Sequence, residues 1–244
     1  MNELFQSVAE NALYVLSFFV IIVLVFVAAL LLEKAARKKN EESGPIFTTR
    51  KLAMIGMFSA IAMILHLFDF PLPFAPAFYK LDFSELPILV GTFAFGPAAG
   101  VMMEFIKILL KLFIKGTSTA FVGDLANFVI GCSFILPASA IYAFHKSKKT
   151  AVAACVIGTV ILTVFGTAFN AVYLLPAFSK LYGMPLEALI EMGSAVNPNV
   201  KGDIVSFVIA CVAPLNLIKG ASVSIVTLLV YKPLSPIIKT GHRA

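Results

Sequence analysis

The sequence contains few charged residues. Asp, Glu, Lys and Arg make up 13% of its 244 residues, roughly half of the 25% that is usual in soluble domains. Hydrophobic residues make up 60%, and the mean hydropathy is +0.97. A chain with so few charged residues cannot form a water-soluble surface around so large an apolar interior. The composition therefore excludes an ordinary soluble domain and predicts an integral membrane protein in a lipid bilayer.

Catalytic and metal-binding patterns are also missing. The three cysteines, Cys132, Cys155 and Cys211, lie in separate apolar runs without metal-ligand spacing, which predicts small buried side chains. The three histidines are scattered, and there is no H-E-x-x-H motif or paired-carboxylate arrangement. We therefore expect no catalytic residues, no metal and no enzyme. The chain also lacks a G-x-x-x-x-G-K-[ST] loop, so any ATP-driven work requires a partner.

Long apolar runs predict an all-α fold with seven membrane crossings. The runs cover about 11–32, 51–69, 84–95, 97–115, 121–144, 151–175 and 203–231. The first run is too long for a signal peptide and has no basic residues before it, so it is interpreted as an extra anchoring helix. The predicted organisation is an N-terminal helix with a basic cytoplasmic linker (1–45), a membrane domain (46–234) and a cytoplasmic tail (235–244).

Lys and Arg residues favour one orientation of these spans. Twelve of the 19 basic residues fall in 33–51, in 145–149 and after the last span, whereas the opposite loops contain Lys80, Lys115, Lys180 and Lys201. The positive-inside rule then predicts an outside N-terminus and a cytoplasmic C-terminus. Basic residues that lie between apolar runs orient a membrane protein, so the net charge of +6 does not indicate nucleic acid.

Lys219 interrupts the apolar segment "NLIKGASVSIVTLLVY". It lies about 12 residues from the cytoplasmic end of the last span, or about 18 Å along a helix. A charge near the bilayer centre costs about 3 kcal/mol and normally faces a partner or a wet cavity. Two interpretations are open: a ligand contact, or a lysine that reaches outward or pairs with a carboxylate. Asn216, at i−3 on the same helix face, favours a ligand contact.

Other amides lie at the same predicted depth. Asn170 occurs in "TAFNAVYLLPAF", and Asp124 and Asn127 occur in "GDLANFVIG", both in the outer half of their spans. Polar groups from three spans at one depth predict a pocket, although hydrogen bonds between helices are the alternative. Asp124 is given no role.

The segment 68–87, "FDFPLPFAPAFYKLDFSELP", is a stiff outer loop rich in proline and aromatic residues. Its Phe74, Phe78, Tyr79 and Phe83 are candidates to cover an apolar ligand. An aromatic belt at the membrane interface is the alternative interpretation.

Two further patterns lie on predicted spans. Glu104, Lys107, Lys111 and Lys115 form a polar stripe at helical spacing, with Glu104 and Lys107 as an internal pair, and the stripe is expected to face the protein interior. The small residues Ala53, Gly56 and Ala60 form a strip that permits close helix approach, either within this protein or to another membrane protein.

Several blocks together resemble a known family. "FYKLDFSELPILVGTFAFGPAAGVMMEFIKILLKLF", "LANFVIG", "FNAVYLLP" and "APLNLIKG" occur in order within residues 50–231. This pattern resembles the riboflavin-specific S components (RibU family) of energy-coupling factor (ECF) transporters. The resemblance implies a six-helix S-component-like bundle, with the helix in the first 45 residues as an addition.

The resemblance also implies a function and partners. Such a protein captures riboflavin outside a bacterial plasma membrane, with FMN as a candidate second ligand, and needs no cofactor. It assembles with a transmembrane coupling protein and two cytoplasmic ATPase subunits. Asn170, Asn216 and Lys219 would grip the flavin ring, Asn127, Tyr79 and Phe83 would form pocket wall and lid, and the strip on residues 53–60 would be the coupling surface. An S component for another vitamin, or an intramembrane enzyme acting on a lipid or isoprenoid, are the alternatives.

Overall fold

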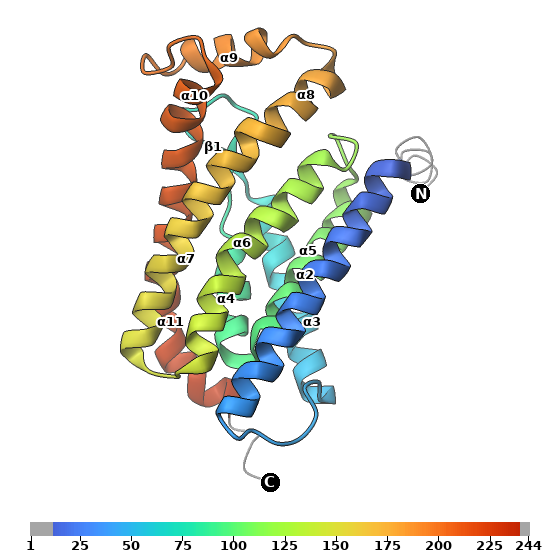
Figure 1. Cartoon of the computed structure of the whole chain (residues 1–244), viewed down its shortest axis with the longest axis vertical. Coiled ribbons are helices and arrows are strands. Elements are labelled where there is room, and N and C mark those ends of the chain that lie inside the picture. Colours follow the sequence, from blue (N-terminus) through green and yellow to red (C-terminus); the bar gives the residue numbers. More distant parts are fainter. Residues whose placement is uncertain (1–11, 240–244) are drawn as a thin grey trace.

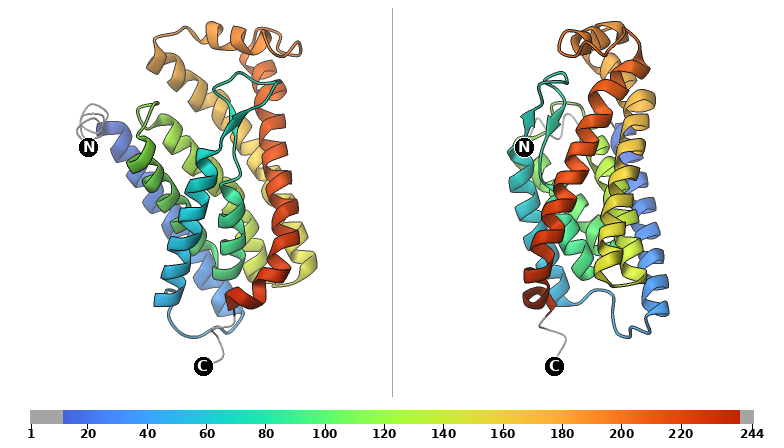
Figure 2. Two further views of the ribbon diagram at one scale, coloured as in Figure 1. Left: turned by 180° about the vertical axis from the view of Figure 1, so that it is seen from behind. Right: turned by 90° about the vertical axis from the view of Figure 1, so that its left-hand side faces the viewer.

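The computed structural model describes the backbone of residues 12–239 and the side chains of residues 16–231. Its long helices run side by side, and short elements close one end of the bundle (Figures 1 and 2). In chain order the elements are α2 (Ala12–Lys39), α3 (Thr49–Leu67), β1 (Phe70–Pro71), β2 (Lys80–Leu81), α4 (Glu85–Phe95), α5 (Pro97–Lys115), α6 (Val122–Phe144), α7 (Lys148–Phe169), η1 (Asn170–Leu174), α8 (Leu175–Tyr182), α9 (Leu186–Ser194), α10 (Ile204–Phe207), η2 (Val208–Val212) and α11 (Ala213–Lys239), where η marks a π-helix.

Each predicted apolar run forms a helix. Five helical segments are long and apolar enough to cross a membrane: Leu16–Lys39, Thr49–Leu67, Val122–Phe144, Lys148–Tyr182 and Ile204–Tyr231. Helix α4 is apolar but has only 11 residues, and α5 carries charged side chains. Helix α11 continues to Lys239, into the predicted tail 235–244. The first residue of the run 11–32 and the last five residues of that tail lie outside the described residues.

Helix ends follow from local sequence chemistry. The side chains of Thr48, Ser147 and Asp203 accept backbone hydrogen bonds at the starts of α3, α7 and α10, as N-cap residues do. Between α4 and α5, Gly96 has a φ of 95°, which favours glycine. Pro97 then occupies the first turn of α5, where a missing N–H costs nothing. The predicted Gly/Pro turn therefore reverses the chain between two helices.

The loop between α3 and α4 contains a feature that the sequence did not predict. Strands β1 and β2 pair antiparallel, with Phe70 opposite Leu81. This small hairpin lies at the end of the bundle that also carries α9 (Figure 2). It returns the chain toward the bundle, so that Tyr79 and Leu81 are buried.

Two long helices contain a π-helical turn. The helix 148–182 changes from α to π at η1, and the helix 204–239 does so at η2. The two π segments contact each other. Such turns shift the direction of the following side chains and are common at functional sites. Asn170 begins η1, and Asn216 follows η2 by one helical turn.

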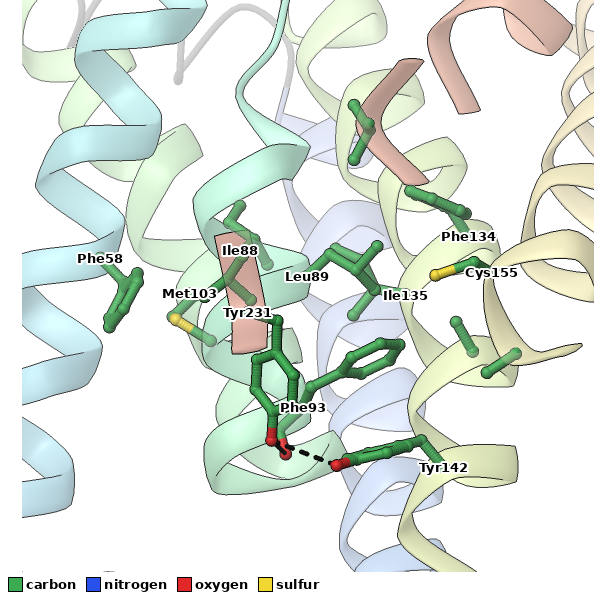
Figure 3. Packing of buried hydrophobic residues seen from close by; sticks show 14 of the residues in the cluster. Phe58, Ile88, Leu89, Phe93, Met103, Phe134, Ile135, Tyr142, Cys155 and Tyr231 are labelled. Atoms are coloured by element: carbon green, nitrogen blue, oxygen red, sulfur yellow. Dashed lines mark hydrogen bonds between the residues drawn. The ribbon is translucent and has the colours of Figure 1, made fainter. Parts of the chain in front are cut away.

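A hydrophobic cluster fills the bundle near the ends of α4, α6 and α11 (Figure 3). Phe93 stacks on Tyr142 with ring centres 4.6 Å apart. Tyr142 donates a hydrogen bond to the hydroxyl of Tyr231 at 3.3 Å, and Tyr231 donates to the Phe93 carbonyl at 3.2 Å. The predicted burial of Cys132, Cys155 and Cys211 is confirmed, and all three are free thiols.

The additional helix α2 packs against α5 and α6. Its Glu33 is buried, accepts a hydrogen bond from the Ala98 amide at the start of α5 (2.9 Å) and pairs with Lys51 of α3 (2.7 Å). The carboxylate thus neutralises a buried ammonium and satisfies a helix N-terminus. One acidic side chain therefore joins α2, α3 and α5 at one end of the bundle.

Replacing Glu33 by Gln should lower stability strongly. The change leaves Lys51 buried without a counter-charge, which costs about 3–5 kcal/mol. The control is Glu42→Gln, because Glu42 pairs with Lys146 at an exposed position, where such pairs contribute at most about 1 kcal/mol. Thermal unfolding in detergent measures both variants. Equal melting temperatures for the two would contradict this account of how α2 is held.

Candidate functional site

A cavity of about 500 Å³ lies among the helices at the hairpin end of the bundle. This volume is typical of sites for drug-sized ligands. The exposed residues Lys115 and Tyr182 line its outer part, so the cavity reaches the surface there. Its wall includes five of the six residues predicted to bind substrate: Tyr79, Asn127, Asn170, Asn216 and Lys219.

Asn170 is held in a fixed orientation. The Tyr79 hydroxyl donates to Asn170 Oδ1 at 2.7 Å, and Asn170 Nδ2 donates to the Gly166 carbonyl at 2.7 Å. Burial, with a smaller effect of Cys211, raises the pKa of the Tyr79 phenol well above its ordinary value. Tyr79 therefore stays protonated and remains a donor. The hairpin loop is in this way connected to η1 across the cavity.

Asn216 has an unused donor. The residue is only 4% exposed, and its Nδ2 has no hydrogen-bond partner among the described residues. Buried polar groups without a partner are rare in folded proteins and require an explanation. The amide lies against Gly166, where an added Cβ would come within 2.6 Å of Nδ2. Glycine at this position thus provides the space that the amide occupies.

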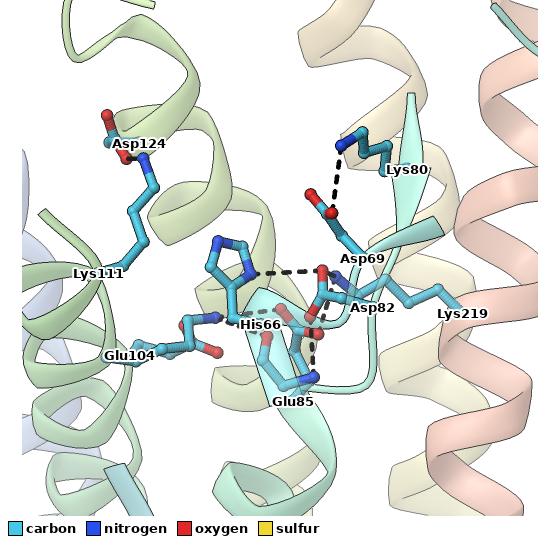
Figure 4. Close-up of polar contacts among 11 residues, drawn as sticks. His66, Asp69, Lys80, Asp82, Glu85, Glu104, Lys111, Asp124 and Lys219 are labelled. Carbon is cyan, nitrogen blue, oxygen red and sulfur yellow. Dashed lines mark hydrogen bonds and ion pairs between the residues drawn. The ribbon is translucent and has the colours of Figure 1, made fainter. Parts of the chain in front are cut away.

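Lys219 is paired with two carboxylates in the cavity wall (Figure 4). Its Nζ donates to Asp82 Oδ2 at 3.0 Å and lies 2.8 Å from Glu85 Oε2. The structure therefore shows the pairing that the sequence left open as one of two interpretations. Because Lys219 also lines the cavity, the pairing does not remove it from the site.

Glu104, Lys107 and Lys111 of the polar stripe on α5 face the interior, as predicted, whereas Lys115 at the end of the helix is exposed. Lys107 has no exposed surface and lies 2.6 Å from Glu104 and 3.3 Å from Glu85. One turn further, Lys111 pairs with Asp124 at 2.7 Å and lines the cavity. The predicted internal pair of Glu104 and Lys107 is confirmed. Asp124, for which the sequence indicated no role, forms the counter-charge of Lys111.

Phe83 is the predicted binding residue that is not part of the cavity wall. The centre of its ring lies 6.3 Å from that of Phe70, which is in strand β1 of the hairpin. The turn of the hairpin instead directs Phe78 and Tyr79 to the cavity, and Phe178 of α8 meets Phe78 edge to face. The aromatic part of the wall therefore consists of Phe78, Tyr79 and Phe178. Of the predicted pair Tyr79 and Phe83, only Tyr79 belongs to it.

Sequence reasoning missed three residues of the charged cluster in Figure 4. Asp82 and Glu85 were within the quoted "LDFSELP" block but were assigned no contact, and His66 was treated as scattered. His66 Nδ1 lies 3.6 Å from Asp82 Oδ2. A usable signal was present, because a lysine inside a span requires an opposite charge. Acidic residues at the start of a neighbouring short span are the natural candidates.

The small-residue strip of α3 lies on the outside of the bundle. Ala53 and Gly56 are exposed, and Ala60 is half-buried. A Cβ added at Gly56 would meet no described atom within 4 Å. Within the described part of the chain, the strip is therefore not used for internal helix packing.

Metal-ligating groups do not gather in this region. Among the described residues, no three or more His, Cys, Asp and Glu side chains are arranged to hold a metal ion. The cavity offers amide, ammonium and aromatic groups, which suit the binding of a polar, partly flat organic molecule.

Comparisons with known proteins agree with this geometry. Residues 50–231 match the family model of the ECF transporter substrate-specific component. The chain belongs to this family. This S component is therefore a multi-pass membrane protein of a transport system and not an enzyme.

Individual relatives cover the same region. The riboflavin transporter RibU of Staphylococcus aureus (strain TCH60) is 40% identical over 191 residues, which are 78% of this chain and 93% of that protein. The riboflavin transporter FmnP of Bacillus subtilis (strain 168) is 32% identical over 196 residues, 80% of this chain and 97% of the relative.

A solved structure supports the fold. It is described as the S component of a bacterial ECF transporter, is 37% identical, and superimposes with a TM-score of 0.60. The similarity covers 97% of that chain but 78% of this one. The predicted six-helix S-component bundle with one extra N-terminal helix is thus confirmed, and α2 precedes the family match.

Gly166→Ala should disturb the site directly. The added methyl group overlaps with the Asn216 amide, and overpacking of this kind costs about 1–3 kcal/mol. Gly56→Ala is the matched control, since the space there is open and alanine favours a helix by up to about 1 kcal/mol over glycine. Opposite shifts in melting temperature are expected. A stabilising effect of Gly166→Ala would contradict the described packing.

Proposed function

We propose that this S component captures riboflavin from outside a bacterial plasma membrane for ATP-driven uptake. Relatives named as riboflavin transporters are 32–40% identical over most of the chain, which favours this ligand over another vitamin. The observation that carries the proposal is the donor of Asn216, which is buried in the cavity wall and has no partner among the described residues. A ligand acceptor would satisfy it.

The chemistry of riboflavin suits the cavity. A flavin presents flat apolar faces and one edge of carbonyl and imide groups. Phe78, Tyr79 and apolar residues of the wall suit the faces. Asn216 and Lys219 supply donors for the polar edge, and Asn170, already oriented by Tyr79, lies in the same wall. Asn127 is proposed to complete the wall, while Phe83 supports the hairpin from outside it.

The orientation and the partners follow the same proposal. The hairpin end of the bundle, with Lys80, Lys115, Lys180 and Lys201, faces outside, and the more basic end faces the cytoplasm. Residues 46–234 form the transport domain, residues 1–45 the additional anchor with its linker, and 235–244 the cytoplasmic end. This chain has no phosphate loop for ATP, so a transmembrane coupling protein and two ATPase subunits supply the energy for uptake.

The outward strip of Ala53, Gly56 and Ala60 is proposed as the docking surface for the coupling protein. Small exposed residues allow a partner helix to approach closely in a membrane. Helix α2 packs on α5 and α6, and the space beside Gly56 is open. The additional helix is therefore compatible with assembly.

Titration with riboflavin tests the ligand. We expect saturable quenching of flavin fluorescence at one ligand per chain, with FMN titrated in parallel. Asn216→Ala should weaken binding by about 10-fold or more, because the hydrogen bond that Asn216 Nδ2 donates to the ligand is lost in a buried site. Asn199→Ala is the control, since Asn199 is exposed and outside the cavity wall. Absence of saturable quenching in folded protein would overturn the riboflavin assignment.

Docking is tested separately with Gly56→Leu. The larger side chain should prevent co-purification with the coupling protein and ATPases, and abolish uptake, while riboflavin binding by the isolated chain is unchanged. Ala153→Leu introduces the same side chain at an exposed position of α7 and should preserve the complex. If Gly56→Leu assembles and transports normally, the coupling surface lies elsewhere.

A further inference from the structure

Asp82 is held in place by other groups besides Lys219. Its Oδ1 accepts a hydrogen bond from the Ser84 amide at 2.8 Å, just ahead of α4. Its Oδ2 accepts from Lys219 at 3.0 Å and lies 3.6 Å from His66 Nδ1. Both oxygens of this buried carboxylate are therefore in contact with protein groups. Asp82 consequently has little freedom to turn toward a ligand in the cavity.

Glu85 is constrained in a similar way. Its two oxygens face two different lysines, with Oε1 at 3.3 Å from Lys107 and Oε2 at 2.8 Å from Lys219. Lys107 is itself fully buried and held by Glu104 at 2.6 Å. The carboxylate also lies in the first turn of α4, where the helix dipole favours negative charge. Glu85 thus remains beside Lys219 as a second negative charge.

The ammonium of Lys219 retains capacity for a ligand. An ammonium group has three N–H donors, and the aligned hydrogen bond is the one to Asp82. Lys219 lines the cavity together with the partnerless amide of Asn216, three residues earlier on the same helix face. Asp82 and Glu85 together contact the ammonium at two positions, which leaves a third N–H donor for a ligand.

We propose that Asp82 is a positioning residue for ligand binding: together with Glu85 it fixes the direction of the Lys219 ammonium, and it acts on the ligand only through Lys219. The inference rests on the proposed function, because it requires that a ligand acceptor meets Lys219. It assigns to the hairpin loop a role beyond covering the cavity. The loop carries the anion that orients a cation of α11, a helix more than a hundred residues later in the chain.

A double-mutant cycle with riboflavin tests this role. Asp82→Asn keeps the shape and the contact with Ser84 but removes the charge, and should weaken binding about 10-fold. Lys219→Gln removes the oriented ammonium and should weaken binding at least as much. If Asp82 acts through Lys219, the double variant binds as the Lys219→Gln variant does, within about twofold. Losses that multiply would show that Asp82 acts independently and would overturn the inference.

Glu33→Gln is the matched control for loss of a buried carboxylate paired with a lysine. Glu33 lies in the last two turns of α2, pairs with Lys51 near the start of α3, and is not part of the cavity wall. Its replacement lowers stability but should leave the riboflavin affinity of the folded protein unchanged. A loss of affinity equal to that of Asp82→Asn would mean that Asp82 has only a structural role, which contradicts the proposal.

One further variant and one further readout keep the test decisive. Lys219→Met also removes the ammonium and replaces Lys219→Gln in the cycle if the latter does not fold. The visible absorption band of bound flavin responds to donors at its polar edge, so Asp82→Asn should shift it and Glu33→Gln should not. If wild-type protein shows no saturable binding, the proposed function is wrong and the inference with it. If wild type binds and Asp82→Asn changes neither affinity nor spectrum, only the inference is wrong.

Discussion

The need to neutralise ammonium groups inside a membrane bundle determines much of this structure. A lysine near the bilayer centre is unfavourable unless it has a partner or water, and Lys107 and Lys219 both lie in the interior. The partners come from three separate elements: Asp82 from the hairpin loop, Glu85 from α4 and Glu104 from α5. These pairs require the hairpin loop to enter the bundle and α4 to begin deep inside it. The loop and the short helix are thus parts of one electrostatic arrangement.

The part of the cavity wall that carries Asn170 and Asn216 depends on the close approach of two helices and not on charge pairs. The Gly166 carbonyl accepts a hydrogen bond from the Asn170 side-chain amide, and the missing side chain of Gly166 leaves space for the Asn216 amide. The π turns η1 and η2 lie in contact next to these asparagines. Rigid helices with locally altered geometry therefore hold two polar groups in an otherwise apolar wall. Such pre-organisation reduces the ordering that a ligand would otherwise impose.

The helices and the depth of the polar residues could be predicted from the sequence. Apolar runs, the Gly96–Pro97 turn and the 3.6-residue period on α5 define them locally. The partners of Lys219 could not be located, because Asp82 lies 137 positions earlier and its approach depends on a hairpin of two-residue strands. Phe83 was placed in the wall for the same reason. Phe83 follows β2 and precedes α4, so its direction depends on how the chain leaves the hairpin, which no local pattern in the sequence specifies.

The central claim is that the cavity holds a flavin whose polar edge meets Asn216 and Lys219. A structure of the protein purified with riboflavin, by crystallography or electron cryo-microscopy, tests this most directly. The account predicts flavin density in the cavity, with ring acceptors about 3 Å from Asn216 Nδ2 and Lys219 Nζ, and with Lys219 still in contact with Asp82. Flavin bound elsewhere, or in the cavity with its polar edge turned away from both nitrogens, would contradict it.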